Sequence, residues 1–172
     1  MRRAWLLAIG LFGGLSACTG PHTDVPEALR LPPDQVGLLR WHGTGAQVYE
    51  CRADARDPSK HVWALRAPEA QLYDAAGTVV GKHYAGPTWQ ALDGSTIVGE
   101  VRAHADSPDP DAIPWLLLAA HSTGGSGVLS RVKSVQRVDT AGGKAPASCG
   151  ADDAGHTLRV PYSAAYVFAV SK

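Results

Sequence analysis

The stretch from residue 83 to residue 95 concentrates side chains that could bind a ligand or carry out a reaction. It contains an imidazole, a phenol, an indole, a carboxylate and a hydroxyl, which belong to His83, Tyr84, Trp89, Asp93 and Ser95. Nucleophilic hydrolases build their sites from an imidazole, a carboxylate and a hydroxyl. We therefore interpret this stretch as the candidate ligand-binding or catalytic segment, and a hydrolase that uses it is one hypothesis for function.

The same stretch also has a purely structural interpretation. Asp93-Gly94-Ser95 is common turn chemistry, and no GxSxG motif frames the serine. On this interpretation Gly86-Pro87 forms a second turn, Trp89 packs in the core and His83 hydrogen-bonds a backbone carbonyl. The sequence leaves both interpretations open.

Two further residues are weaker candidates for ligand binding. Trp41, like Trp89, lies beside glycine-rich or polar segments, where an indole could stack on a sugar ring and polar groups fix its orientation. Arg137 alternates with Arg131 and Lys133 along one predicted strand face. A solvated face is the default interpretation of that pattern, and a strip that binds an anionic ligand is the alternative. A carbohydrate or another small molecule is the ligand class these residues favour.

Metal and nucleic-acid chemistry have little support in the sequence. The seven histidines are dispersed at positions 22, 42, 61, 83, 104, 121 and 156, without HxH or HExxH spacing. A metalloprotein would need the fold to bring dispersed histidines together, so it stands as a second alternative while we predict no metal or cofactor. The formal net charge is zero, which predicts no nucleic-acid partner.

The N-terminus has the pattern of an export signal. Two arginines precede an apolar run at residues 6–14, which is too short to span a bilayer, since a spanning helix needs about 20 residues. Residues 15–18 read Leu-Ser-Ala-Cys and resemble the lipobox of bacterial lipoproteins. That resemblance implies cleavage before Cys18, acylation of Cys18 and anchoring in the lipid bilayer. The resemblance to Gram-negative lipoproteins further implies the outer membrane, because Thr19 and not Asp follows the cysteine. An ordinary secretory signal is the alternative.

Two cysteines remain once Cys18 is assigned to lipid. The cell envelope is oxidising, so Cys51 and Cys149 are predicted to form a disulfide, with two free buried thiols as the alternative. Closing so long a loop stabilises a domain by roughly 4 to 5 kcal/mol in the chain-entropy model.

Short strands separated by turns dominate the rest of the chain. Residues 1–17 are predicted to be the signal peptide, residues 18–37 a lipidated N-terminus and flexible tether, and residues 38–172 a single β domain. A hairpin turn is predicted at residues 74–77, and no helical periodicity extends over twelve residues. The predicted fold is all-β, an antiparallel sandwich or barrel-like domain with long loops. Strand-like patterns occur at residues 46–51, 61–65, 70–73, 78–83, 96–101, 115–120, 128–138 and 162–170.

Several runs together resemble the exported bacterial and fungal domain-of-unknown-function family 3455. They are residues 44–51, Trp63 with residues 67–70, residues 81–89 with 93–95, residues 113–118, residues 136–146 with Cys149, and residues 161–166. The resemblance extends from about residue 25 to the C-terminus, with Asp139 where Asn is expected. It implies a single secreted domain with a Cys51–Cys149 pair and implies no activity. We therefore interpret the chain as a binding or structural protein of the cell envelope.

Overall fold

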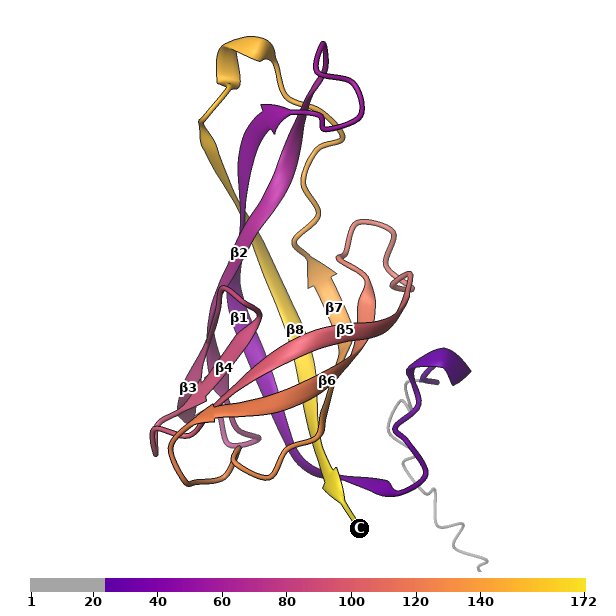
Figure 1. The fold of residues 1–172 in the computed structure, drawn as a ribbon, viewed down its shortest axis with the longest axis vertical. Coiled ribbons are helices and arrows are strands. Elements are labelled where there is room, and N and C mark those ends of the chain that lie inside the picture. Colours follow the sequence, from indigo (N-terminus) through magenta and orange to yellow (C-terminus); the bar gives the residue numbers. More distant parts are fainter. Residues whose placement is uncertain (1–23) are drawn as a thin grey trace, which may run out of the picture.

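The structure, a computed structural model, describes residues 24–172 and forms a closed barrel of eight antiparallel strands (Figure 1). Each strand pairs with the next along the chain, and the first also pairs with the last. The all-β antiparallel prediction is therefore confirmed, and the barrel is the form that the sheet takes. The elements are η1 (Glu27–Leu29), β1 (Gln35–Ala53), β2 (His61–Tyr73), β3 (Val79–Tyr84), β4 (Thr88–Ala91), β5 (Thr96–Ala105), β6 (Trp115–Gly124), β7 (Ser134–Gly142), η2 (Ala151–Asp153) and β8 (Thr157–Ser171).

Alternating side chains fill the barrel interior. Along β8, Tyr162, Tyr166 and Phe168 all belong to the core, as expected for residues two apart on one strand. Gly43 on β1 leaves room for these rings, because a Cβ there would lie 2.6 Å from the Tyr166 ring. Gly99 on β5 does the same for Trp89, with a Cβ distance of 2.8 Å. Glycines inside the barrel thus give space to its aromatic rings.

The long strands β1, β2 and β8 continue past the barrel as an arm at the top of Figure 1. Cys51 on β1 forms a disulfide with Cys149 in the β7–β8 connection, across 98 residues of sequence. The predicted bridge is confirmed. Backbone hydrogen bonds run beside it, from Cys149 to His61 and from Cys51 to His156. The bridge therefore fastens the tip of the β1–β2 hairpin to the β7–β8 connection.

The segment before β1 packs against the outside of the barrel. Leu29 in η1 is completely buried against Trp115, Val138 and Ala165. Its carbonyl accepts a hydrogen bond of 2.6 Å from Gln136 Nε2. The folded part of the chain therefore begins before residue 38, because this apolar side chain has a site on the barrel wall. A tether stays a prediction for residues 18–23, which lie outside the described residues together with Cys18 and the signal segment.

Three predicted strands are wrong in extent. Residues 61–65 and 70–73 belong to the single strand β2, in which Pro68 lies opposite Gln47. Residues 128–133, the first part of the predicted strand 128–138, form a turn and a short irregular segment, and β7 begins at Ser134. Leu129 and Val132 are nevertheless buried in the core. These two side chains are three residues apart, so a loop inserts them into the end of the barrel without the period of a strand.

Asp139 occupies a backbone conformation that limits the residue type. Its φ is +50°, the only positive φ of a non-glycine residue within the described chain. Asn and Asp tolerate this left-handed conformation better than other side chains. The position where the family pattern suggests Asn therefore accepts Asp without a change of backbone.

Candidate functional site

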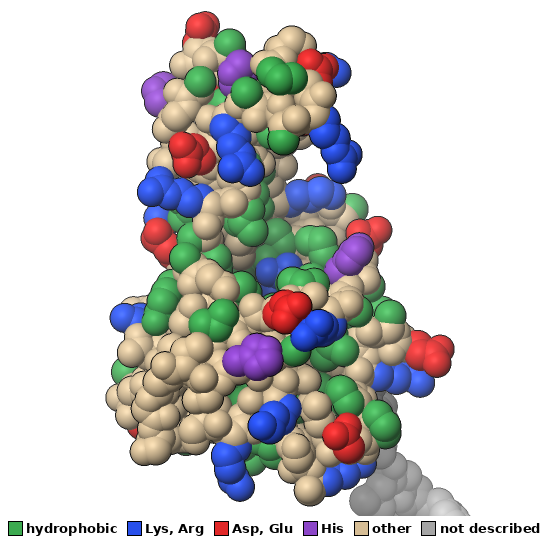
Figure 2. All heavy atoms as spheres, in the orientation of Figure 1, with side chains coloured by type: hydrophobic (Ala, Val, Ile, Leu, Met, Phe, Trp, Pro, Cys, Tyr) green, Lys and Arg blue, Asp and Glu red, His purple; other side chains and the backbone are tan. Residues whose placement is uncertain are grey.

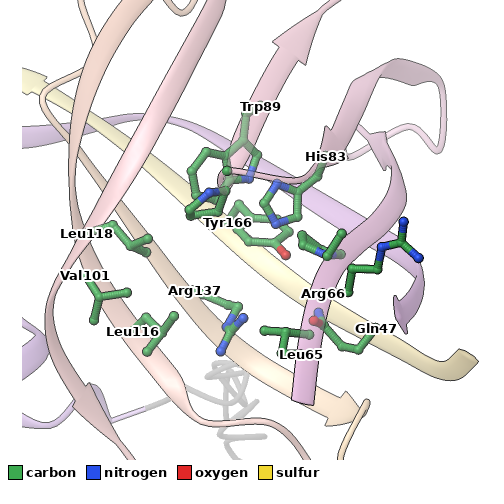
Figure 3. A pocket seen from close by; sticks show the side chains of 14 residues that line it. Gln47, Leu65, Arg66, His83, Trp89, Val101, Leu116, Leu118, Arg137 and Tyr166 are labelled. Carbon is green, nitrogen blue, oxygen red and sulfur yellow. The ribbon is translucent and has the colours of Figure 1, made fainter. Parts of the chain in front are cut away.

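A cavity of about 320 Å³ opens where the arm meets the barrel, between β2 and the β5–β6 hairpin. Figure 2 shows this face hollowed at mid-height, with hydrophobic side chains around the hollow and a Lys or Arg side chain inside it. Figure 3 shows aromatic side chains on one side of the cavity and aliphatic side chains on another, with Arg137 between Leu116 and Leu65. The cavity is therefore apolar in part and carries a few polar groups, as ligand sites in proteins usually do.

Three rings form one wall of the cavity. His83 on β3 stacks on Trp89 of β4, with ring centroids 4.4 Å apart and an interplanar angle of 14°. The Tyr166 ring meets both edge-on, at 5.1 Å and 5.6 Å. His83 Nδ1 lies 2.8 Å from the carbonyl oxygen of Thr88, so Nδ1 carries the hydrogen and donates it. Burial lowers the pKa of His83 from 6.5 to about 3, and the imidazole is neutral at physiological pH.

We predict that His83 makes the protein sensitive to mild acid. The unfolded chain binds a proton at this residue below its ordinary pKa of 6.5, whereas the folded chain binds it only near 3. The contribution of neutral His83 to the free energy of unfolding is therefore complete above pH 6.5, and this contribution is lost as the pH falls toward 3. Between pH 7.5 and pH 5 the loss should be about 2 kcal/mol. Urea unfolding at both pH values measures it, and His83→Gln should remove most of this difference. Equal pH dependence in both proteins would refute the prediction.

Arg137 brings a positive charge into the barrel. It shares the inward face of β7 with Val135, which is completely buried. Its Nε and Nη2 atoms donate to the carbonyl oxygen of Pro114, at 3.1 Å and 2.8 Å. Among the described residues no carboxylate forms an ion pair with it. Burial lowers the pKa of the guanidinium, because the low dielectric disfavours its charge. The charge persists at neutral pH, since arginine does not deprotonate in proteins.

Hydrogen-bond donors that have no partner among the described residues line the same cavity as this charge. Gln47 is 1 % exposed and lines the cavity, yet its Nε2 has no partner among the described residues. The indole Nε1 of Trp89 is also buried without a partner. The Tyr162 and Tyr166 hydroxyls lie 3.1 Å apart and share one hydrogen bond, which leaves one of the two protons unused. Burial raises the pKa of both phenols, so both keep their protons.

The opposite wall and the rim are apolar. Leu118 is buried and Leu116 is partly buried, whereas Leu65 and Val101 are 57 % and 50 % exposed at the opening. None of the fourteen lining residues is acidic, and Arg66 adds a second cation, which points away from Arg137 in Figure 3. The cavity thus combines aliphatic walls with positive charge.

The structure divides the predicted segment between the two ends of the barrel. His83 and Trp89 lie opposite each other in the β3–β4 hairpin and line the cavity. Asp93 and Ser95 lie in the next turn, at the other end of β4. Tyr84, adjacent to His83, faces the other side of the sheet, and its hydroxyl donates to Gln90 Oε1 at 3.4 Å. The five candidates therefore do not form one site.

Asp93 and Ser95 hold the loop that closes the lower end of the barrel. The Asp93 carboxylate accepts hydrogen bonds from the backbone N–H and hydroxyl of Ser95 and from the N–H of Val128. The Ser95 hydroxyl in turn accepts from the N–H of Leu129, at 3.1 Å. These bonds lower the pKa of Asp93. The serine hydroxyl donates to a carboxylate and not to a histidine, so the described arrangement lacks the nucleophile–base pair of a hydrolase.

We predict that Ser95→Ala destabilises the protein by about 1 to 3 kcal/mol, because the N–H of buried Leu129 loses its acceptor. Urea unfolding measures the change. Thr96→Ala is a matched control, since the Thr96 hydroxyl bonds only the exposed carbonyl of Gly94 at 3.2 Å. The prediction fails if the two variants are equally stable.

The remaining candidates from the sequence are Trp41, as a sugar-binding ring, and the dispersed histidines, as metal ligands. Trp41 is buried and meets Phe168 edge-on at 4.9 Å, so it offers no exposed ring for a sugar, because its strand face points into the barrel. Within residues 24–172 no three His, Cys, Asp or Glu side chains are grouped to hold a metal ion. No helix in that part of the chain is long and apolar enough to cross a membrane.

The sequence interpretation missed most of the cavity. No sequence motif singles out Gln47 or Tyr166, and Arg137 follows two cations, Arg131 and Lys133, that the structure places at the surface. One signal was present: Arg137 is two residues from Val135, and Tyr166 is two residues from Phe168. Each polar residue therefore shares a strand face with an apolar one. What the sequence alone did not reveal is which face of each strand points inward.

The fold and the site together define an eight-stranded antiparallel barrel with a partly apolar, positively charged cavity at one end. A barrel of this size has an interior just wide enough to be filled by side chains or to hold one small ligand. The chain belongs to the family described as "Protein of unknown function (DUF3455)", whose model matches residues 32–169. No curated protein and no solved structure matches the chain.

Proposed function

We propose that this protein is an envelope lipoprotein whose barrel binds a small molecule in the cavity between the arm and the barrel. The observation that supports the proposal is the cavity itself. It has exposed aliphatic side chains at its opening and unpaired buried donors inside, including Gln47 Nε2. Buried polar groups normally have hydrogen-bond partners, so unpaired donors beside a cavity favour a ligand that supplies acceptors.

A largely apolar small molecule with a few acceptor atoms suits the cavity better than a carbohydrate. One face of the Trp89 ring is covered by His83, and Trp41 is buried in the core. Sugars bind on open aromatic faces, with several polar groups around them. The hydrolase alternative has weaker support than binding, because the Ser95 hydroxyl donates to Asp93 and His83 Nδ1 donates to the Thr88 carbonyl, so the two side chains do not pair.

Titration with the neutral dye 1-naphthylamine, whose size suits a cavity of about 320 Å³, tests the proposal. The full chain carrying Cys18→Ala avoids the need for detergent. We expect saturable binding of one dye molecule, and Val101→Trp should abolish it by filling the opening. Val128→Trp is the matched control: Val128 is 46 % exposed, against 50 % for Val101, but lies at the other end of the barrel. Absence of saturable binding, or equal binding by both variants, would exclude a ligand cavity.

The membrane anchor is the second part of the proposal. It is supported by the Leu-Ser-Ala-Cys run ending at Cys18, and by the disulfide, which is typical of an oxidising compartment. We expect the protein to take up a labelled fatty acid and to fractionate with the outer membrane. Cys18→Ala should lose both properties, since acyl chains provide the attachment. A wild-type protein without label would refute the lipoprotein assignment.

A further inference from the structure

We infer that the cavity binds a medium-chain monocarboxylate, with its carboxylate on Arg137 and its hydrocarbon chain along Leu65, Val101 and Leu116. The inference rests on the proposed function, because it names the ligand class of the same cavity. Three features of the described residues carry it: a positive charge without a counterion, a surplus of hydrogen-bond donors, and an apolar wall that leads from the charge to the solvent.

The charge of Arg137 calls for an anion. Arg137 is partly buried, and a cation that is partly removed from water loses hydration, which an opposite charge offsets. No described carboxylate pairs with Arg137, and no acidic residue lines the cavity. The Pro114 carbonyl uses only Nε and Nη2, so the Nη1 amino group remains available. These two hydrogen bonds fix the guanidinium in place, and its Nη1 edge can donate to a ligand.

The donors around Arg137 suit a carboxylate. Gln47 Nε2 lacks an acceptor among the described residues. When Tyr162 donates to Tyr166, the Tyr166 hydroxyl, which lines the cavity, keeps a proton to give. A carboxylate accepts several hydrogen bonds and donates none, so it satisfies these groups. An alcohol brings only one acceptor oxygen and no charge. A phosphate carries more negative charge than the single inner cation balances, since the second cation, Arg66, points away from Arg137.

The apolar wall and the cavity volume determine the chemistry and length of the rest of the ligand. Leu116, Leu118 and Val101 lie together on one side of Arg137, and Leu65 lies on its other side (Figure 3). The exposed side chains of Val101 and Leu65 mark the opening. If each non-hydrogen atom takes about the 30 Å³ of a water molecule, the cavity of about 320 Å³ holds on the order of ten such atoms. A linear fatty acid with about eight to ten carbons has this size, and the exposed side chains at the opening gain an apolar partner.

Isothermal titration with three ligands of one length tests the inference on the unchanged cavity. The chain carrying Cys18→Ala is titrated with decanoate, 1-decanol and decylamine. We expect decanoate to bind about tenfold to hundredfold more tightly than decanol, the range for a hydrogen bond to a charged group. Decylamine should not bind. Equal binding of decanoate and decanol would overturn the inference but leave the proposed ligand-binding function intact. If the dye also fails to bind, the inference and the proposed function are both overturned.

Substitutions then locate the carboxylate. Arg137→Met should remove the preference for decanoate while retaining decanol binding, which shows that the barrel is still folded. Arg137→Lys keeps the charge and should retain part of the preference. Arg131→Met is the matched control, because Arg131 is exposed outside the barrel, and it should bind both ligands as the parent chain does. A preference for decanoate that survives Arg137→Met would overturn the inference.

Discussion

Replacing Cys51 and Cys149 by alanine is expected to lower the free energy of unfolding by about 4 to 5 kcal/mol, a large share of a typical domain's stability. The bridge closes a loop across 98 residues, and in the chain-entropy model its stabilisation comes from restricting the unfolded chain. Urea unfolding followed by tryptophan fluorescence measures the loss. The arm should open first, because the bridge fastens its tip to the β7–β8 connection.

Reduction of the wild-type protein provides the control. Dithiothreitol should lower the stability of the wild type to that of the double variant and should leave the variant unchanged. Hydrogen exchange should show the largest increase at residues 51 and 149, where backbone bonds accompany the bridge. A loss below 1 kcal/mol would mean that the arm is held by its strand pairing alone.

Trp89→Ala should cost about 3 to 5 kcal/mol, the range for removing a large buried aromatic side chain. Trp89 is 1 % exposed and contacts the rings of His83, Tyr166 and Phe168. Its removal leaves a hole beside a cavity that already exists, so the surrounding strands have little to collapse onto. Urea unfolding followed by circular dichroism measures the change without relying on the lost indole.

Leu92→Ala is the matched control, because Leu92 lies in the turn directly after β4 and is 73 % exposed. It should change the stability by less than about 0.5 kcal/mol. Trp89→Phe should lie between the two, since it keeps a ring in the stack. If Trp89→Ala is no less stable than Leu92→Ala, the aromatic wall of the cavity does not support the barrel.

Much of the fold followed from local patterns. The alternation in residues 46–51 and 162–170 and the turn at residues 74–77 are set by side-chain period and turn chemistry, which act over a few residues. The extent of β2 was not predictable in the same way. Pro68 normally interrupts a strand, and it is accepted here beside the register shift at Val48 and Tyr49.

The site was harder to predict because ring closure creates it. His83 and Trp89 were found because they lie close together in the sequence. Arg137, Gln47 and Tyr166 come from three other strands, and their proximity depends on pairings that join distant parts of the chain. Asp93 and Ser95 have the residue types of a hydrolase site, but they accept hydrogen bonds from the backbone of the loop after β6 and hold that loop in place.

The pairing of β1 with β8 has a consequence for how the protein is made. Gln35 lies opposite Ser171 and Glu50 lies opposite Thr157, so these partners are 136 and 107 residues apart in the chain. A chain synthesised or exported from its N-terminus has two unpaired strand edges, β1 and β7, until the fifteen residues of β8 arrive. Contacts of such separation slow folding. The barrel is therefore expected to close late, and a chain that ends before Thr157 should aggregate instead of folding.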